Sequence, residues 1–290
     1  MQQRRAFPVK REAALKQLSK RLSPAEKILY FAKRFCVESS SRSYPLVTTS
    51  GSNFDSVLQC SMAYNKYGGY CVPLSSSHRP AAKTILSGDI WEPKTIEFLM
   101  SCCGAGDIVH AGTFFGDFLP ALSQSSAQGG RIWAFEPNPE NYRCAFITTH
   151  INGLQNVELI NAGLGERRGF LQMVTSDTHG MSLGGASRMV QETDEDNTEG
   201  AITVEVVAID EVIPSERKIS IIQLDVEGFE KPALAGALKI IRRCKPILIL
   251  ESLPDEEWLS TNILQLGYRI AGEADENTIL ISDESPDAAN

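Results

Sequence analysis

From residue 93 onward, the hydrophobic and polar positions follow a regular succession of helix and strand patterns. Helical spacing of apolar side chains predicts helices over residues 93–103, 116–127, 139–152 and 231–243. Continuous apolar runs predict strands over residues 107–111, 131–135, 157–160, 219–224, 247–250 and 278–282. Strands that are apolar on both faces and alternate with helices predict a doubly wound α/β domain with a mostly parallel sheet.

Two segments interrupt this succession. Residues 168–174 and 202–209 alternate apolar and polar side chains, which predicts an added antiparallel strand pair. Between them, residues 176–200 are polar, acidic and rich in glycine, without any periodicity. A loop of this length is usually either functional or disordered, and the sequence favours neither alternative.

The first 90 residues have a different character. Apolar residues at helical spacing predict helices within residues 10–37, a Ser- and Thr-rich linker follows over 39–53, and residues 54–86 are expected to be rich in loops. We therefore expect a helical N-terminal arm with a lid or substrate segment over residues 1–90. The α/β domain is expected to cover residues 91–284.

The composition is that of an ordinary globular enzyme, with 42% hydrophobic and 22% charged residues. No apolar run approaches the roughly 20 residues that span a bilayer, and no secretory signal is visible. Seven cysteines are scattered without a disulfide framework or the spacing of a zinc site. These observations predict a cytoplasmic protein without a membrane span.

The charge is distributed unevenly along the chain. Residues 1–42 carry eleven Lys or Arg against three acidic residues, so the overall charge of −8 leaves −16 on the remainder. An acidic body argues against nucleic acid as the substrate, because binding a duplex requires a basic face. The basic arm is either a solvated helical face or a contact surface, for an anionic partner, for a membrane surface or for a second copy of the chain.

A glycine-containing turn follows the first predicted strand of the domain. Its sequence runs from His110 through Gly112 and Thr113 to Gly116, after which a helix begins. Glycines at such a turn let a ligand approach the backbone, and a helix N-terminus offers unpaired N–H groups to an anion. The spacing differs from that of dinucleotide-binding folds, which disfavours a nicotinamide dehydrogenase. Glu136 ends the next strand, where a carboxylate is placed to accept hydrogen bonds from ribose hydroxyls.

A second group of acidic residues follows the later strands. Asp225 and Glu227 come directly after the run 219–224, and Glu251 ends the run 247–250. We expect Glu251 to lie beside Asp225, at the edge where open α/β sheets bind ligands. Such carboxylates suit a polar substrate, and a divalent cation would also fit them. Because no third oxygen ligand is evident in the sequence, we do not favour a metal.

Together these segments resemble the FkbM family of methyltransferases. The resemblance covers residues 90–270 and is most specific in the run Asp225-Val226-Glu227-Gly228-Phe229-Glu230. It also rests on residues 110–116, 135–139, 161–162, 208–210, 235–237, 250–251 and 266–268. The resemblance implies a class I, Rossmann-like methyltransferase of EC class 2.1.1 with S-adenosylmethionine as methyl donor. The usual acceptor would be a hydroxyl oxygen on a sugar, a polyketide or a related small metabolite.

The resemblance also implies roles for individual residues. In this family pattern, the residues around the methionine portion of the cofactor would be Gly112, Thr113 and Gly116, and Glu136 would bind the ribose. The residues bordering the adenine would be Asn138, Asn161 and Ala162, and Asp225 would face the methyl group. We expect Gly112→Val to abolish cofactor binding and leave the fold intact.

The sequence departs from the family pattern at one position. His110 stands where the family has an Asp that steadies the cofactor's ammonium group. A neutral imidazole can accept a hydrogen bond there, whereas a charged one would repel the ammonium. We expect Glu92, just before the first domain helix, to supply the missing negative charge. The departure keeps open an alternative function, a cofactor-binding regulatory protein that has lost methyl transfer.

Three residues are candidates for the base that removes the acceptor's hydroxyl proton. They are Asp225, Glu251 and His78. His78 belongs to a Ser-His-Arg-Pro segment that either folds over the cofactor as a lid or lies on the surface as an ordinary loop.

Overall fold

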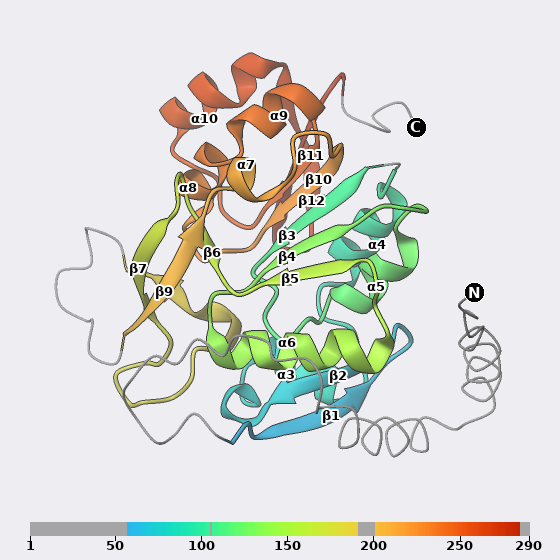
Figure 1. The fold of residues 1–290 in the computed structure, drawn as a ribbon, viewed down its shortest axis with the longest axis vertical. Helices are drawn as coiled ribbons and strands as arrows, with labels where there is room; N and C mark the ends of the chain where they lie inside the picture. Colours follow the sequence, from blue (N-terminus) through green and yellow to red (C-terminus); the bar gives the residue numbers. More distant parts are fainter. Residues whose placement is uncertain (1–56, 105, 191–200, 285–290) are drawn as a thin grey trace, which may run out of the picture. The chain divides into compact units, whose positions relative to one another are not determined.

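The computed structural model describes residues 57–104, 106–190 and 201–284 (Figure 1). All of them belong to one unit that begins at residue 55. The helices predicted within residues 10–37, the linker over 39–53 and the contact role of the basic arm lie outside the described residues. In the described part of the chain, no helix is long and apolar enough to cross a membrane.

A seven-stranded sheet forms the centre of the unit, in the order β12-β13-β11-β10-β3-β4-β5. Five strands are parallel: β3 (Asp107–Ala111), β4 (Ile132–Phe135), β5 (Val157–Ile160), β10 (Ile219–Leu224) and β11 (Ile247–Leu250). The edge strands β13 (Asn277–Ser282) and β12 (Tyr268–Ala274) are antiparallel. This confirms the predicted mostly parallel α/β fold. The sequence analysis did not predict β12, because the five residues between its two ends are all exposed and leave no apolar run.

Helices cover both faces of this sheet (Figure 1). Helices α4 (Pro93–Ser101) and α5 (Leu119–Ser125) pack on one face, where Leu99 and Leu119 meet Ile108 of β3. Helices α8 (Glu230–Ala235), α9 (Leu238–Cys244) and α10 (Glu256–Asn262) pack on the other, where Leu234 meets Val109. Neighbouring residues of β3 thus point to opposite faces, as the pleat requires, and both faces are buried.

The single helix predicted over residues 231–243 is wrong. The structure has two short helices, α8 and α9, separated at Gly236 and Ala237. A side chain at Gly236 would collide with the carbonyl oxygen of Gly165, so the backbone passes very close to a neighbouring segment there. The carboxylate of Asp210, in α7 (Ile209–Val212), accepts hydrogen bonds from the first N–H groups of α9, those of Lys239 and Ile240. These contacts stabilise a second helix start inside the amphipathic segment.

The added antiparallel pair is confirmed. Strands β7 (Gly169–Val174) and β9 (Ile202–Val207) pair antiparallel, and with β6 (Gly163–Leu164) and β8 (Arg188–Met189) they form a four-stranded sheet. Strand β8 lies within the predicted loop over residues 176–200, of which the structure describes residues 176–190. This part of the loop is therefore built into the sheet and is not a bare connection.

The expectation of a loop-rich segment over residues 54–86 is wrong for the described residues. Strands β1 (Cys60–Tyr64) and β2 (Gly69–Pro73) form a hairpin, and α3 (Pro80–Leu86) follows. The turn carries an Asn65-x-x-Gly68 signal, in which the Asn65 N–H donates to the Gly68 carbonyl. Tyr70 and Phe115 are fully buried against each other, while the long helix α6 (Pro139–Asn152) contributes Cys144 to the same cluster. The hairpin is thus packed on the glycine-containing turn.

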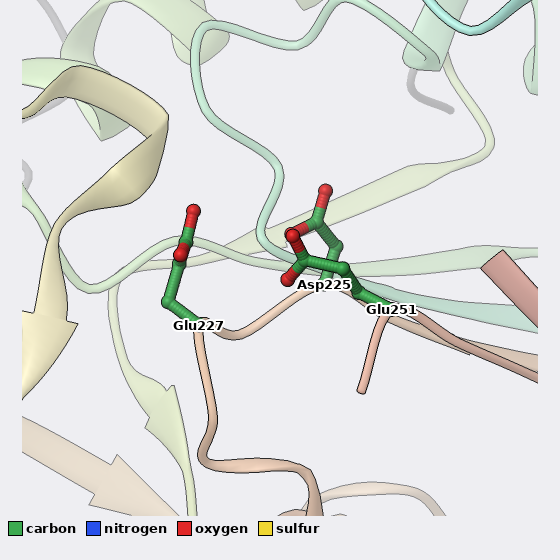
Figure 2. A group of neighbouring side chains, drawn as sticks. All are labelled: Asp225, Glu227 and Glu251. Atoms are coloured by element: carbon green, nitrogen blue, oxygen red, sulfur yellow. The ribbon is translucent and has the colours of Figure 1, made fainter. Parts of the chain in front are cut away.

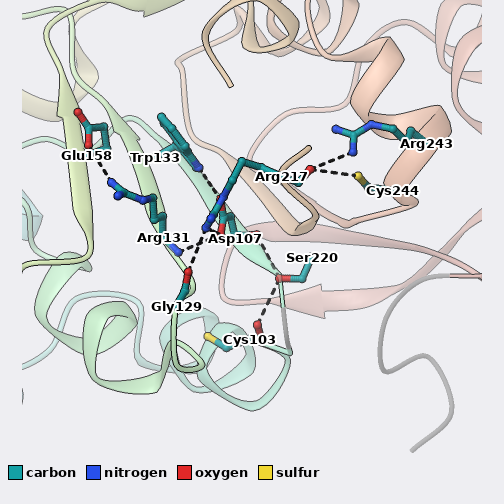
Figure 3. Close-up of polar contacts among 10 residues, drawn as sticks. All are labelled: Cys103, Asp107, Gly129, Arg131, Trp133, Glu158, Arg217, Ser220, Arg243 and Cys244. Carbon is teal, nitrogen blue, oxygen red and sulfur yellow. Dashed lines mark hydrogen bonds and ion pairs between the residues drawn. The ribbon is translucent and has the colours of Figure 1, made fainter. Parts of the chain in front are cut away.

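A buried carboxylate joins the strands at their amino-terminal ends (Figure 3). Asp107, at the start of β3, accepts hydrogen bonds from the Trp133 indole at 2.8 Å, from the Arg131 N–H at 3.0 Å and from the Arg217 guanidinium. Arg217 also donates to the Gly129 carbonyl. The carboxylate next to Arg217 raises the pKa of that guanidinium. This group of residues, here called the Asp107 cluster, lies at the end of β3 opposite to the glycine-containing turn.

Candidate functional site

Two adjoining cavities open at the carboxyl ends of the parallel strands, with about 460 Å³ and 770 Å³ of empty space. The smaller, here called the apolar cavity, is lined by Phe135, Ala162, Leu164, Met173, Met189 and Phe229, with Glu136. The larger, here called the acidic cleft, is lined by six acidic residues: Glu92, Asp117, Asp225, Glu227, Glu251 and Glu276. Gly112, Gly185 and Asp225 line both, so the two cavities are continuous.

Glu136 lies in the apolar cavity with its carboxylate held by the backbone. One oxygen accepts the Phe114 N–H at 2.7 Å and the other the Asn138 N–H at 2.8 Å. Burial raises the pKa of Glu136 to about 8, although these two hydrogen bonds and a further one from the Asn141 side chain oppose the shift. Two carboxylate oxygens have about four acceptor positions, so the group retains capacity to accept a hydroxyl donor from a ligand.

Gly112 brings β3 and β10 together at the border of the two cavities. Its φ of 82° lies in the left-handed region, and a Cβ there would collide with the carbonyl oxygen of Asp225. The expectation that Gly112→Val would leave the fold intact is therefore wrong. The chain's own backbone, and not only a ligand, requires glycine at this position.

The other members of the glycine-containing turn and its surroundings have partners inside the protein. Thr113 donates its backbone N–H to the Phe135 carbonyl, and Gly116 closes a tight turn with Thr113. Asn138 caps helix α6 by accepting the Glu140 N–H, while Asn161 donates to the carbonyls of Glu136 and Pro137. Thr113, Gly116, Asn138 and Asn161 line neither cavity, whereas Ala162 lines the apolar cavity. Thr113, Gly116, Asn138 and Asn161 thus support the segments around the cavities and do not face the empty space themselves.

His110 faces the acidic cleft as a neutral imidazole. Its ring stacks on Phe118, with centroids 5.3 Å apart and an interplanar angle of 11°, and its Nδ1 lies 2.5 Å from Oε1 of Gln223. Because an amide oxygen only accepts, Nδ1 carries the proton and Nε2 carries a lone pair. Burial lowers the pKa of His110 to about 4. Nε2 is buried and has no hydrogen-bond partner among the described residues.

Three carboxylates converge at the ends of β10 and β11 (Figure 2). One ligand atom from each of Asp225, Glu227 and Glu251 lies within 4.8 Å of the others. The expected proximity of Asp225 and Glu251 is confirmed, since the N–H groups of both residues donate to the ends of neighbouring strands. Glu227 brings a third carboxylate to this group, which the sequence analysis did not expect. Its φ of 54° turns the chain back so that its side chain reaches the same space.

The convergence of these carboxylates changes their acidity. Burial, and then the charge of Glu251, hold the pKa of Asp225 well above its usual range. Burial raises the pKa of Glu227 to about 7, with a further contribution from Glu251. Perturbed carboxyls of this kind in a cleft are typical of functional sites.

Two further carboxyls line the acidic cleft, the half-buried Glu92 and the buried Asp117. Glu92 precedes α4 with a φ of 45° and accepts a hydrogen bond from the Asn277 amide at 2.7 Å. Asp117 follows Gly116 and is only 7% exposed. Burial raises the pKa of both groups, that of Asp117 to about 7. The sequence analysis expected Glu92 near the site and missed Asp117, which reads as an ordinary acidic residue before a helix.

The segment that contains His78 reaches the site through a different residue. His78 lines neither cavity, while its neighbour Arg79 lines the acidic cleft and is the single cation among the described residues that line it. Arg79 lies close enough to Glu227 to oppose the rise of that residue's pKa. The sequence analysis did not single out Arg79.

The family model described as the methyltransferase FkbM domain matches residues 103–270, which is more than half of the chain. Among solved structures, the methyltransferase FkbM from Methylobacillus flagellatus KT is 22% identical with a TM-score of 0.42, and the match covers 61% of this chain and 43% of that chain. This chain therefore spans less than half of that relative.

Further similar structures are methyltransferases. One from Geobacter sulfurreducens is 16% identical with a TM-score of 0.40, covering 66% of this chain and 80% of that chain. A SAM-dependent methyltransferase from Aquifex aeolicus is 16% identical with a TM-score of 0.35, covering 66% and 89%. No curated protein matches the chain.

Proposed function

Because the chain belongs to the FkbM family of S-adenosylmethionine-dependent methyltransferases, we propose that it methylates a hydroxyl oxygen of a small acceptor such as a sugar, a polyketide or a related metabolite. The observation that carries the proposal is the Asp225–Glu251 pair in the acidic cleft, next to the border with the apolar cavity. A hydroxyl must lose its proton as it is methylated, and a paired carboxylate is suited to accept that proton.

The residues of the site fit the cofactor. The apolar cavity offers Ala162, Met173 and Met189 to a flat adenine ring, with Glu136 in reach of the ribose hydroxyls. Since the cavities meet at Gly112, the amino-acid end of the cofactor would extend into the acidic cleft. There Nε2 of His110 is a buried acceptor that has no hydrogen-bond partner among the described residues. Because buried polar atoms are normally hydrogen-bonded, this atom is suited to accept a hydrogen bond from a ligand.

When bound, the cofactor supplies an electrophilic methyl group on a positively charged sulfur. The remaining steps belong to the protein. Asp225 lines both cavities and would therefore lie near the reacting methyl, where it accepts the acceptor's hydroxyl proton. A carboxylate with a raised pKa is a stronger base once it is ionised, and general-base catalysis contributes typically about 10²–10⁴-fold. Holding the hydroxyl in line contributes more, roughly 7–11 kcal/mol.

The acceptor would enter from the side of the cleft that carries Arg79 and Ala186. These residues come from the two segments whose sequence is least regular, residues 57–90 and 176–190. Arg79 and Glu227 provide both donors and acceptors for the hydroxyl groups of a polar acceptor. This composition supports a hydrophilic metabolite over a lipid.

The proposal is tested with purified chain, methyl-labelled cofactor and a panel of glycosides and polyketide alcohols. We expect labelled product in which the methyl group lies on oxygen, as located by NMR. Turnover should fall about 10²–10⁴-fold in Asp225→Asn. The control variant Glu276→Gln, which removes an exposed carboxyl from the same cleft, should keep most of the activity. Methyl transfer to nitrogen or carbon would refute the oxygen specificity. Cofactor binding without turnover on any acceptor would favour the regulatory alternative.

A further inference from the structure

The turn between β10 and α8 presents two carboxylates to the acidic cleft in an unusual backbone conformation. This turn, residues 225–229, is here called the acidic turn, and its Asp225 and Glu227 line the cleft. Glu227 has a φ of 54° and Gly228 a φ of 86°, so two consecutive residues lie in the left-handed region. Glycine adopts this conformation freely, whereas a residue with a Cβ keeps it only where the surrounding structure holds it. Some group must therefore hold Glu227.

The carboxylate of Glu230 is the group that holds the acidic turn. Glu230 is the first residue of α8, and its exposed fraction is only 2%. Its Oε1 accepts the Val226 N–H at 3.2 Å, and its carboxylate also accepts the Gly228 N–H. Val226 and Gly228 are the two neighbours of Glu227 in the chain. The carboxylate thus fixes the backbone on both sides of the left-handed residue.

Glu230 faces the acidic turn and lines neither cavity. Burial raises the pKa of this carboxyl to about 6, and the N–H groups of the turn oppose the rise. A buried carboxylate is costly to keep in a protein unless such donors compensate for the lost water. The proposed methyl transfer gives Glu230 no contact with a ligand, so the turn is what this buried group serves.

The acidic turn decides where its two carboxylates lie. The Asp225 N–H donates to the Ala111 carbonyl at 3.1 Å, so the backbone of Asp225 continues β10 alongside β3. Glu227 lies two residues beyond this contact, and its carboxylate meets those of Asp225 and Glu251 through the left-handed turn (Figure 2). If the turn relaxed to an ordinary φ, the side chain of Glu227 would point in another direction.

We propose that Glu230 is a positioning residue for methyl transfer, which holds the acidic turn so that Glu227 stays beside Asp225 in the cleft. The inference rests on the proposed function, since it assumes that Asp225 accepts the acceptor's hydroxyl proton. Glu230 contacts neither cofactor nor acceptor and acts through Glu227. Burial and Glu251 raise the pKa of Asp225, and the charge of Glu227 adds to their effect. Losing Glu227 from the cleft would therefore weaken the base and remove a hydrogen-bond acceptor for the substrate.

The competing explanation gives Glu230 a role in α8 alone. An acidic residue in the first turn of a helix stabilises the helix dipole, and Glu230 holds that place in α8. Glu256 offers a matched control, because it is the first residue of α10 and is exposed. If the dipole were the whole role, Glu230→Ala and Glu256→Ala should behave alike. A positioning residue should instead lower turnover in Glu230→Ala, while Glu256→Ala keeps the turnover of the unmodified chain.

The first measurement compares turnover with cofactor affinity, using the acceptor that the unmodified chain methylates fastest. We expect Glu230→Ala to lower kcat about 10²-fold, as for a reacting group misplaced by roughly 1 Å. Its affinity for S-adenosylhomocysteine in calorimetry should change far less, because Glu136 and the glycine-containing turn follow other strands. Glu230→Gln keeps an oxygen for the Val226 N–H, so its kcat should lie much closer to that of the unmodified chain. Equal losses of kcat and affinity in Glu230→Ala, or equal losses of kcat in the two variants, would overturn the inference.

The second measurement tests the hold on Glu227 without any acceptor. In Glu227→Gly the left-handed conformation no longer needs support. We therefore expect Glu230→Ala to lower the melting temperature clearly less in the Glu227→Gly background than in the unmodified chain. Should Glu230→Ala alone not fold, a folded double variant would support the same conclusion.

The two measurements keep the inference and the proposed function apart. Equal falls in melting temperature in both backgrounds would overturn the inference and leave the proposed function standing. If the unmodified chain methylates no acceptor, the proposed function fails and Glu230 loses its role in transfer, while the melting temperatures still decide whether Glu230 holds the turn.

Discussion

The Asp107 cluster offers a direct test of what stabilises the sheet. The change is Asp107→Asn, which keeps the size of the side chain and removes its charge and one of its two acceptor oxygens. In the structure these two oxygens serve Trp133, Arg131 and Arg217, and the Asp107 side chain is 3% exposed. The substitution therefore leaves at least one buried donor unpaired and the Arg217 charge without its partner.

The magnitude follows from the burial of the two partners. Breaking a fully buried ion pair typically costs about 3–5 kcal/mol. The Arg217 side chain is 29% exposed, so water relieves part of this loss, and we expect about 3 kcal/mol. For a domain of this size, each kcal/mol lowers the melting temperature by roughly 2–4 °C. The expected fall is therefore about 6–12 °C.

The measurement is urea and thermal unfolding of the unmodified chain and two variants. Glu158→Gln is the matched control, because Glu158 pairs with Arg131 on the same surface at 3.2 Å with both side chains about half exposed. Such an exposed pair contributes less than about 1 kcal/mol. Asp107→Asn should also retain affinity for S-adenosylhomocysteine, since Asp107 lies at the opposite end of β3 from the site. A loss no larger than that of Glu158→Gln would refute the reasoning.

Three further outcomes follow from the site. Glu136→Ala should weaken the binding of S-adenosylhomocysteine by about 1.5–3 kcal/mol in calorimetry. It should also lower the melting temperature, because two backbone N–H groups lose their acceptor. A change in affinity of only a few tenths of a kcal/mol would place the ribose elsewhere. Affinity for S-adenosylhomocysteine should be highest well above pH 7 and fall as the pH drops through 7, because protonation of Asp117, whose pKa is raised to about 7, removes negative charge from the cleft that would receive the ligand's ammonium. This fall should be smaller in Asp117→Asn and should not be centred on His110, whose pKa is lowered to about 4. Chelators should leave the rate of methyl transfer unchanged, whereas Asp225→Asn should lower it. If a chelator instead abolishes activity and Mg²⁺ or Mn²⁺ restores it, the three carboxylates form a metal site.

The central sheet could be predicted from the sequence because its strands are buried on both faces. Strands β3, β5, β10 and β11 begin and end at the predicted residues, since a continuous apolar run has no other stable place in a domain of this class. The hairpin of β1 and β2 could not be recognised in the same way. Only one of the five residues of β1 is buried, so this strand has no continuous apolar run. Tyr70 in β2 is buried by tertiary contacts, among them the one with Phe115.

The candidate site was predicted where it depends on strand ends and missed where it depends on backbone conformation. Asp225 and Glu251 follow buried strands, so their proximity could be inferred from parallel pairing alone. Glu227 was visible in the same run, but only its left-handed φ directs the side chain toward its neighbours. Asp117 depends likewise on the tight turn at Gly116. Conformations of this kind are rare for residues other than glycine and carry no sequence signal of their own.

Strain and charge gather in the same part of the molecule. Of the five non-glycine residues with positive φ in the described part of the chain, Glu92, Phe114 and Glu227 line the acidic cleft. Such conformations persist only where the surrounding structure holds them, and they are typical of ligand sites. The acidic cleft and the adjoining apolar cavity also carry carboxyls whose pKa values are raised by burial, so the free protein should lose stability as the pH rises from the ordinary range of these groups toward about 8. A cationic ligand relieves both the burial of charge and the mutual repulsion. The cofactor is therefore expected to stabilise the chain more at pH 8 than at pH 5. When the cofactor is not bound, the packed sheet and the Asp107 cluster stabilise the cleft.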